Sequence, residues 1–149
     1  MSVDVLVFEV DELQCAIESA VISECLRALA FRSIPGQPPF IAGVFDLRGT
    51  VVPVLDLHVR FGGTPRPVRL DDAFVVARAH RRSVALWVDR LVGLVPFDTR
   101  TFAARDGLMT GTRSFAGVAR LGESLVMIHD VEAFLTQTEA DALASLQIA

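Results

Sequence analysis

"GVFDLRGTVVPVLDLHVRFG", residues 43–62, is the stretch that decides the fold. Apolar residues alternate with other residues on both sides of Arg48-Gly49, and a period of two is typical of half-buried strands. Glycine adopts a positive φ without steric cost, so Gly49 favours a tight turn. The stretch therefore predicts two strands joined at Arg48-Gly49, with Phe45 and Leu47 on one face of the first strand.

The second predicted strand carries an unbroken apolar face on its odd-numbered residues, from Val51 to Phe61. Its other face starts apolar and ends polar, at Asp56, His58 and Arg60. Pro53 has no N–H for a strand ladder, so it predicts an edge or a bulge.

The same period recurs along the chain and predicts a mostly β fold of small barrels or a sandwich. Hairpins are expected to turn at Asp11-Glu12, across 80–82 and at Gly122-Glu123, with a further strand at 91–97. Residues 18–31 fit either a helix or a strand, 33–40 form a proline-rich rigid loop, and 98–114 form a long exposed loop. Thr138 and Asp141 resemble a capping box, which predicts a short C-terminal helix.

Composition excludes several classes of function. The chain has 149 residues, 52% of them apolar, and a mean hydropathy of +0.46, enough for one domain or two small subdomains. Its formal net charge of −4 argues against nucleic-acid binding. The chain has no apolar run of membrane-spanning length and no basic leader before its first strand, so we expect a cytoplasmic protein without membrane insertion.

No combination of residues predicts an enzyme, a metal site or a cofactor site. Asp56 and His58 would share one strand face, but a tetrahedral metal needs three or four ligands. His129-Asp130 could activate a nucleophile, yet no serine lies in a nucleophile-elbow context, and an ordinary turn is the simpler interpretation. Cys15 and Cys25, ten residues apart without a CxxC pattern, are expected to be buried, reduced thiols.

The stretch "PPFIAGVFDLRGTVVPVLDLHVRFG" resembles the signature of CheW-like domains. That signature has an apolar-Gly-apolar entry, an Asn-Leu-Arg-Gly turn and a Pro-apolar-apolar-Asp-Leu segment. "FEVDELQCAI", "VALWVDRLVGL" and "FAGVARLGESLVMIHDVEAFL" resemble further parts of the same family, in the same order. The resemblance spans about residues 5 to 135.

This resemblance implies two intertwined five-stranded SH3-like β-barrels within residues 1–136, followed by a C-terminal helix and tail at 137–149. It also implies a non-enzymatic adaptor that couples the cytoplasmic tip of a methyl-accepting chemoreceptor to the regulatory domain of a CheA-type histidine kinase. The alternative is a CheW-like binding module of a motility, pilus or developmental pathway that has lost its kinase or receptor surface.

Site residues follow from the same resemblance, position by position. Arg48 matches the motif arginine near the receptor groove, and Glu24 matches a partner-contacting glutamate. The expected partner-binding residues are Ile22, Glu24, Cys25, Val44, Asp46 and Arg48, and the expected structural residues are Gly43, Gly49, Pro53 and Asp56.

The chain also departs from the family pattern. Asp46 stands where the family usually has Asn, and its charge could neutralise Arg48, two residues away on the same face. Cys25 replaces a bulkier aliphatic residue, and His129 stands where an apolar residue is common.

Overall fold

The computed structural model describes residues 2–98, 103–104 and 115–144, and strands dominate them. The elements in chain order are β1 (Ser2–Val10), β2 (Leu13–Glu18), η1 (Ser19–Val21), β3 (Ile22–Arg27), β4 (Ile41–Leu47), β5 (Thr50–Asp56), α1 (Leu57–Arg60), β6 (Ala73–Ala79), β7 (Arg82–Val88), β8 (Arg90–Asp98), β9 (Ala103–Ala104), β10 (Phe115–Leu121), β11 (Ser124–His129), η3 (Val131–Phe134) and α2 (Gln137–Ala144).

Three hairpins turn through two residues that both have positive φ, as in type I′ turns. The predicted turns at Asp11-Glu12 and Arg48-Gly49 are confirmed, and the β6–β7 hairpin turns at His80-Arg81. The backbone twist of such turns matches the right-handed twist of the strands that they join.

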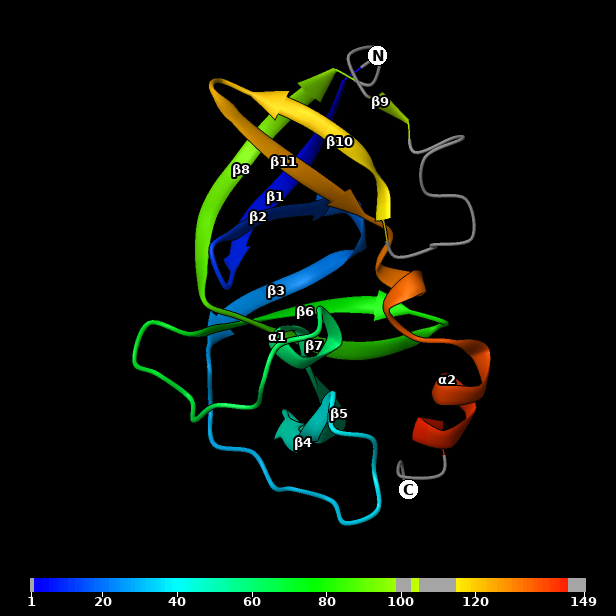
Figure 1. Ribbon diagram of the computed structural model, residues 1–149. Helices are drawn as coiled ribbons and strands as arrows, with labels where there is room; N and C mark the ends of the chain where they lie inside the picture. Colours follow the sequence, from blue (N-terminus) through cyan, green and yellow to red (C-terminus); the bar gives the residue numbers. More distant parts are fainter. Residues whose placement is uncertain (1, 99–102, 105–114, 145–149) are drawn as a thin grey trace.

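The strands form two stacked units, an upper barrel and a lower barrel (Figure 1). The upper sheet has the strand order β8-β1-β2-β11-β10-β9, and the lower sheet has the order β3-β6-β7-β5-β4. The chain forms β1 and β2 of the upper sheet, then β3 to β7 of the lower sheet, and then returns to the upper sheet with β8 to β11. The two barrels are therefore intertwined. This confirms the expected fold, with the two-residue β9 as a sixth strand in the upper sheet.

A backbone bridge joins the segment that follows β3 to the end strand β4. The Arg32 N–H donates to the Val44 carbonyl at 2.8 Å, and the Val44 N–H donates to the Arg32 carbonyl at 2.9 Å. The bridge brings the chain that leaves β3 against β4 and pairs part of the outer edge of β4.

β1 explains why the barrels pack so closely, because both of its faces are buried. Val5 and Val7 point into the upper-barrel core, while Leu6 and Phe8 point into a third core between the barrels. Leu86 of β7 and Phe134 of η3 belong to the same inter-barrel core. The lower-barrel core contains Phe45, Phe74 and Trp87.

The second strand of the opening hairpin is shorter than predicted. β5 ends at Asp56, whose carboxylate accepts the His58 N–H at 2.9 Å and the Val59 N–H at 3.4 Å and thereby starts α1. The prediction of a strand as far as Phe61, with Asp56 and His58 on one strand face, is therefore wrong: a side-chain cap overrides the alternating pattern.

Pro53 lies in an internal strand, contrary to the expectation of an edge. Its partner is Val44 on β4, and the ladder to β7 begins only at the next residue, Val54. The backbone N–H and carbonyl of Val44 both bond to Arg32 instead. Neither β4 nor β7 therefore requires a hydrogen bond from the backbone nitrogen of Pro53. The bulge in this pair lies on β4, between Ile41 and Gly43.

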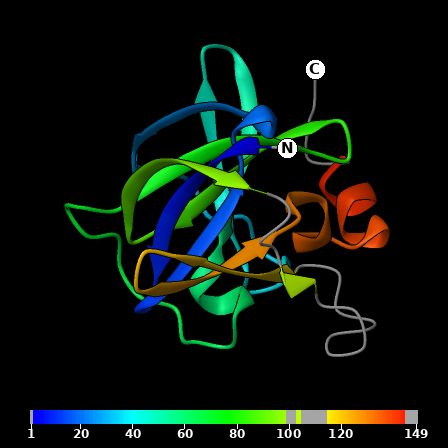
Figure 2. The same ribbon diagram turned by 90° about the horizontal axis from the view of Figure 1, so that it is seen from above.

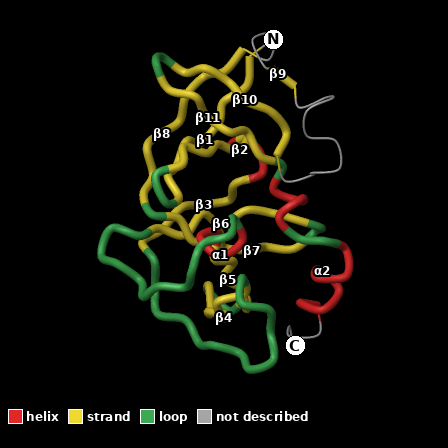
Figure 3. Tube along the Cα trace, viewed as in Figure 1, coloured by secondary structure: helices red, strands yellow, loops and turns green. Residues whose placement is uncertain are grey.

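Residues 18–31, which the sequence left open, form η1, β3 and the start of a loop. Two long loops, 28–40 and 61–72, leave the lower barrel (Figure 3). Of the predicted loop at 98–114, Asp98 ends β8 and β9 pairs with β10, while the rest lies outside the described residues.

The C-terminal helix begins with a capping box two residues earlier than predicted. Thr136 Oγ1 accepts the Glu139 N–H at 3.0 Å, and the Glu139 carboxylate accepts the Thr136 N–H at 2.8 Å. Glu139 also binds Arg60 at 3.0 Å, which ties α2 to α1. Seen from above, η3 and α2 lie on one side of the barrels and loop 61–72 on the other (Figure 2). None of the helices in the described ranges is both long and apolar enough to cross a membrane.

Candidate partner-binding surfaces and a buried junction

Glu24 and Arg48, both expected to contact a partner, meet each other in the structure. Arg48 Nη1 lies 3.3 Å from Glu24 Oε1, and Nη2 contacts Oε2, so the guanidinium holds the carboxylate at two points. The hydrogen bonds and charge of Glu24 raise the pKa of Arg48. With 71% of the Arg48 side chain exposed, the pair presents its outer side to solvent.

The Asp46 carboxylate bonds to the backbone of the β4–β5 turn and not to the Arg48 guanidinium. Its Oδ1 accepts the Gly49 N–H at 2.9 Å, a bond that spans the Arg48-Gly49 turn. The carboxylate bonded to Arg48 is that of Glu24. An asparagine, the residue usual in the family, could accept the same backbone bond through its amide oxygen.

The register of β3 separates Glu24 from its sequence neighbours. Glu24 pairs with Val76, whose side chain belongs to the lower-barrel core, whereas Cys25 pairs with Val75, which belongs to the inter-barrel core. Because opposed residues of antiparallel strands point to the same face, Ile22 and Cys25 face the space between the barrels and Glu24 does not. The predicted cluster on β3 therefore lies on two faces.

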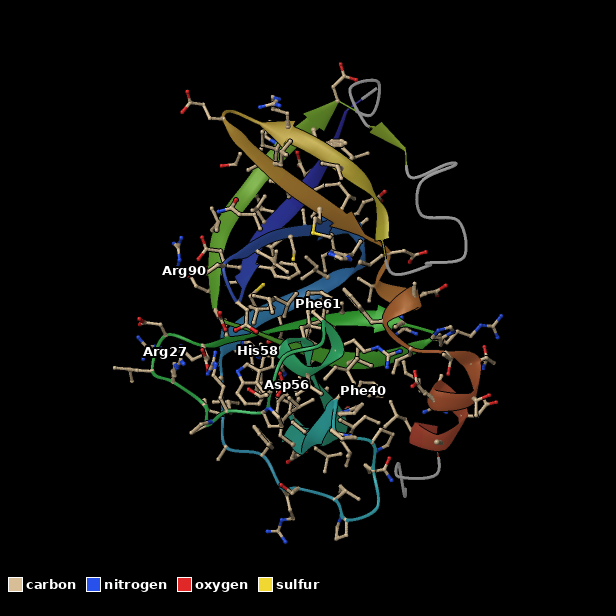
Figure 4. All side chains as sticks on the ribbon, viewed as in Figure 1. Arg27, Phe40, Asp56, His58, Phe61 and Arg90 are labelled. Carbon is tan, nitrogen blue, oxygen red and sulfur yellow. The ribbon has the colours of Figure 1, made fainter. Side chains whose placement is uncertain are left out.

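A groove opens where β3, loop 61–72 and the start of β8 meet, and we call it the inter-barrel groove. Its volume is about 570 Å³, and its lining includes Cys25, Arg27, Leu70, Asp71, Arg90 and Leu91. Leu70 is 83% exposed, the largest value among the exposed large apolar residues of the described chain. The side chain of Arg90 lies above that of Arg27 on the side of the molecule where this groove opens (Figure 4).

Cys25 is exposed at this groove, so the prediction that it is buried is wrong. β3 is the end strand of its sheet, so no further strand of the described ranges pairs with its outer edge. Cys15 is buried as predicted, and burial raises the pKa of its thiol to about 12. Partial burial and the charge of Glu24 raise the pKa of Cys25 as well.

A second groove, the lower-barrel groove, lies on the closed edge of the lower sheet. It is mostly apolar, and Leu29, Phe31, Val44, Asp46 and Val51 line it. Val44 and Asp46, two of the expected partner-binding residues, thus lie together here, beside the turn that carries Arg48.

Beneath the inter-barrel groove lies a buried polar group that we call the junction cluster: Asp56, His58, Arg66, Asp72, Trp87 and Asp89. His58 Nδ1 is 2.6 Å from Asp56 Oδ1, and its Nε2 contacts Asp89 Oδ1. Burial alone would lower the pKa of His58, but the hydrogen bonds and charges of the two carboxylates outweigh it and raise the pKa above its ordinary value.

Arg66 connects the rest of the cluster. Its guanidinium binds both oxygens of Asp72, at 2.8 and 2.9 Å, and reaches Asp89 Oδ1 at 2.5 Å. Trp87 Nε1 donates to Asp72 at 3.0 Å. Burial opposes ionisation of Asp72 and Asp89, yet their hydrogen bonds, above all those from Arg66 and His58 respectively, lower both pKa values.

The cluster also bears on the prediction that the chain has no metal site. Ligand atoms of Asp11, His58 and Asp89 lie within 4.8 Å of one another. Arg66 Nη2 lies 3.0 Å from His58 Nε2 and 2.5 Å from Asp89 Oδ1, so a guanidinium already supplies positive charge at the point where these atoms converge.

His129, the other histidine weighed as a chemical group, packs between rings. It stacks on Phe61 at 5.2 Å between centroids and lies 5.3 Å from Phe134. Asp130 caps η3 by accepting the Glu132 N–H at 3.0 Å. An aromatic environment thus accommodates a histidine where the family often has an apolar residue.

Comparison with known proteins agrees with this architecture. The model of the CheW-like domain family matches residues 4–139. The chain belongs to the CheW-like domain family. It is 23% identical to the chemotaxis protein CheW of Treponema pallidum over 93% of this chain and 85% of that protein. It is 26% identical to the chemotaxis protein CheW of Helicobacter pylori over 86% of this chain and 78% of that protein.

A solved structure shows the same fold. The scaffolding protein TtCheW of Thermoanaerobacter tengcongensis superposes with a TM-score of 0.83 at 24% identity, covering 91% of this CheW-like chain and 93% of that one. The relatives are thus described as chemotaxis and scaffolding proteins. The roles of individual residues in partner binding remain predictions.

Sequence reasoning missed most of the junction cluster. Arg66, Asp72 and Asp89 were not among the candidate residues, although two signals were available. Arg66 lies between two prolines, which restrict its backbone, and Asp89 directly follows a buried strand. Neither signal shows that the two meet, because the contact depends on packing between elements.

Proposed function

We propose that this CheW-like protein is a non-enzymatic adaptor that couples the cytoplasmic tip of a chemoreceptor to a CheA-type histidine kinase. The observation that carries the proposal is the inter-barrel groove, whose lining combines apolar Leu70 and Leu91 with the guanidinium groups of Arg27 and Arg90. A helical hairpin can lay its apolar stripe into such a groove and place acidic residues against the arginines. Family membership supports this assignment.

The kinase side of the proposal uses the outer edge of β8, with which no strand of the described ranges pairs. β8 is an end strand, and its Val92 and Leu94 are 45% and 64% exposed. An unpaired edge with apolar side chains can add to a similar barrel, such as the CheW-like regulatory domain of the kinase. The receptor would then contact the start of β8, at Arg90 and Leu91, and the kinase would contact the strand further along, at Val92 and Leu94.

Binding assays with each partner test the proposal. The purified protein should retain the kinase regulatory domain and a receptor-tip fragment from the same organism, each at tens of micromolar or below. Leu70→Asp should weaken the receptor interaction alone, and Leu94→Asp the kinase interaction alone. Failure to bind the kinase domain at those concentrations would overturn the adaptor proposal and favour a binding module with a single working surface.

A matched control is available on the same barrel. Leu125 is 59% exposed on β11, away from the residues that line either groove. Leu125→Asp should therefore leave both interactions unchanged. If it weakened both, the effects of the other two variants would reflect altered folding rather than lost contacts.

A further inference from the structure

His58 is held by carboxylates at both ring nitrogens, and its side chain is only 1% exposed. Asp56, at the end of β5, faces Nδ1, and Asp89, between β7 and β8, faces Nε2. A neutral imidazole has one N–H, so it can donate to only one of them. Both contacts are hydrogen bonds only while the ring carries two protons.

Loss of one proton changes the hydrogen bonds of Arg66. In the protonated state, Nη2 of Arg66 can use its two hydrogens for Asp72 and Asp89. In the neutral state, a ring that keeps its Nδ1 proton for Asp56 presents a lone pair at Nε2. Nη2, 3.0 Å from that nitrogen, then has three acceptors for two hydrogens.

We propose that His58 is a pH-sensitive link between the two barrels, whose deprotonation weakens the Asp89–Arg66–Asp72 contacts and thereby loosens the wall of the inter-barrel groove. This inference rests on the proposed function only where it concerns partner binding. The change within the protein follows from the cluster itself.

The cluster reaches the groove through loop 61–72. Asp72 Oδ2 accepts the Arg69 N–H at 2.7 Å, and the Arg69 carbonyl accepts the Asp72 N–H at 3.1 Å. These bonds hold the segment that carries Leu70. Asp89 also accepts the Asp11 N–H at 2.8 Å, so the same carboxylate fixes the β1–β2 turn of the upper barrel.

The direction of the pH effect follows from the charges that face His58. Asp56, Asp89 and the nearby Asp11 favour the imidazolium, while Arg66 opposes it, with Asp72 compensating part of that arginine's charge. The balance raises the pKa of His58. A raised pKa in the folded state means that the stabilisation is complete below the ordinary histidine value and is lost as pH rises through the raised one.

Nuclear magnetic resonance of the three histidine rings in the full chain tests the first step. We expect the His58 ring, assigned by its loss in His58→Gln, to be protonated at both nitrogens below a midpoint above the ordinary value. Above the midpoint it should keep only the Nδ1 proton. A ring that is neutral throughout, or that titrates at or below the ordinary value, would overturn the proposal.

Hydrogen exchange tests the second step. After correction for the intrinsic pH dependence of exchange, protection of the Arg69 and Asp72 amides should fall by about fivefold or more across the same midpoint.

Asp89→Asn, a second variant in case His58→Gln does not fold, should lower the His58 midpoint. His80→Gln removes a ring that bonds the Glu132 and Leu135 carbonyls at the opposite side, and it should change neither result. If protection of the Arg69 and Asp72 amides in the wild type did not change across the midpoint, the proposed link from His58 to loop 61–72 would be contradicted.

A binding measurement separates this inference from the proposed function. Affinity for the receptor-tip fragment should fall by about fivefold or more between one pH unit below and one above the midpoint, and His58→Gln should remove this dependence. An affinity that is measurable but independent of pH would overturn regulation of the groove. Absence of binding at every pH would count against the proposed function, while the resonance and exchange results would still decide whether His58 is the link.

Discussion

Glu24 on β3 and Arg48 in the β4–β5 turn form a two-point ion pair across the two end strands of the lower sheet. The two residues are 24 positions apart in sequence, and their contact depends on closure of the sheet. The backbone bridge between Arg32 and Val44 joins the segment just after β3 to β4, in the same part of the barrel. The charged surface around Arg48 is therefore a product of barrel closure.

Arg48 lies beside the lower-barrel groove and not in the inter-barrel groove, and the family resemblance implies a partner contact for it. On that basis Arg48→Ala is expected to weaken coupling of the kinase to the receptor while leaving the melting temperature nearly unchanged. Exposed ion pairs contribute little to stability because water screens them, and 71% of the Arg48 side chain is exposed. Kinase activity in a reconstituted receptor complex and thermal denaturation provide the two measurements. A large drop in melting temperature would instead identify Arg48 as a structural residue. The charge swap Glu24→Arg with Arg48→Glu serves as a control that keeps the pair.

Asp46→Ala is expected to destabilise the protein by about 1 kcal/mol, the usual contribution of one hydrogen bond. The lost bond is the one from the Gly49 N–H to the Asp46 carboxylate. Asp46→Asn keeps an acceptor and should be close to the wild type in urea denaturation. If the two variants were equally unstable, the charge of Asp46, rather than its bond to the turn, would be the stabilising feature.

Gly43→Ala is expected to cost about 2 kcal/mol or more, since overpacking against rigid backbone is destabilising. A Cβ at this position would overlap the Arg32 carbonyl oxygen and lie 2.8 Å from the carbonyl carbon, at the bridge that closes the lower sheet. Gly36→Ala is the matched control, because its Cβ would meet nothing within 4 Å and only its positive φ opposes the change. That control should cost about 1 kcal/mol. Equal losses in chemical denaturation would show that no close approach exists at Gly43.

Leu143→Ala is expected to reduce the free energy of unfolding by about 2–4 kcal/mol. Leu143 is 1% exposed and belongs to the inter-barrel core, although it lies in α2 near the end of the chain. Leu125→Ala, at an exposed position, should change stability by about 0.5 kcal/mol or less. A single cooperative transition in both variants would show that α2 unfolds with the barrels. The predicted boundary between residues 136 and 137 would then not separate two independent units.

The predicted parts of this structure are those with a local signal. Hairpins were found because alternation and turn residues lie within a few positions of each other, as around Arg48-Gly49. α1 was missed because Leu57, Val59 and Phe61 continue the alternation, while the Asp56 cap that ends the strand is only one residue. The cap of α2 was placed two residues late because Thr138 with Asp141 and Thr136 with Glu139 have the same spacing, and the choice depends on Arg60, far away in sequence.

The amino-acid sequence determined the strands, most of their turns and membership of the CheW-like family, because alternation, turn chemistry and motif spacing are properties of neighbouring residues. Closure of the barrels decided what surrounds the functional side chains. It placed Cys25 at the inter-barrel groove and Glu24 against Arg48, and it placed His58 against Asp89, 31 positions further along the chain. Such contacts have no local signature, because they form only when the two barrels share a core and exclude water from the groups between them.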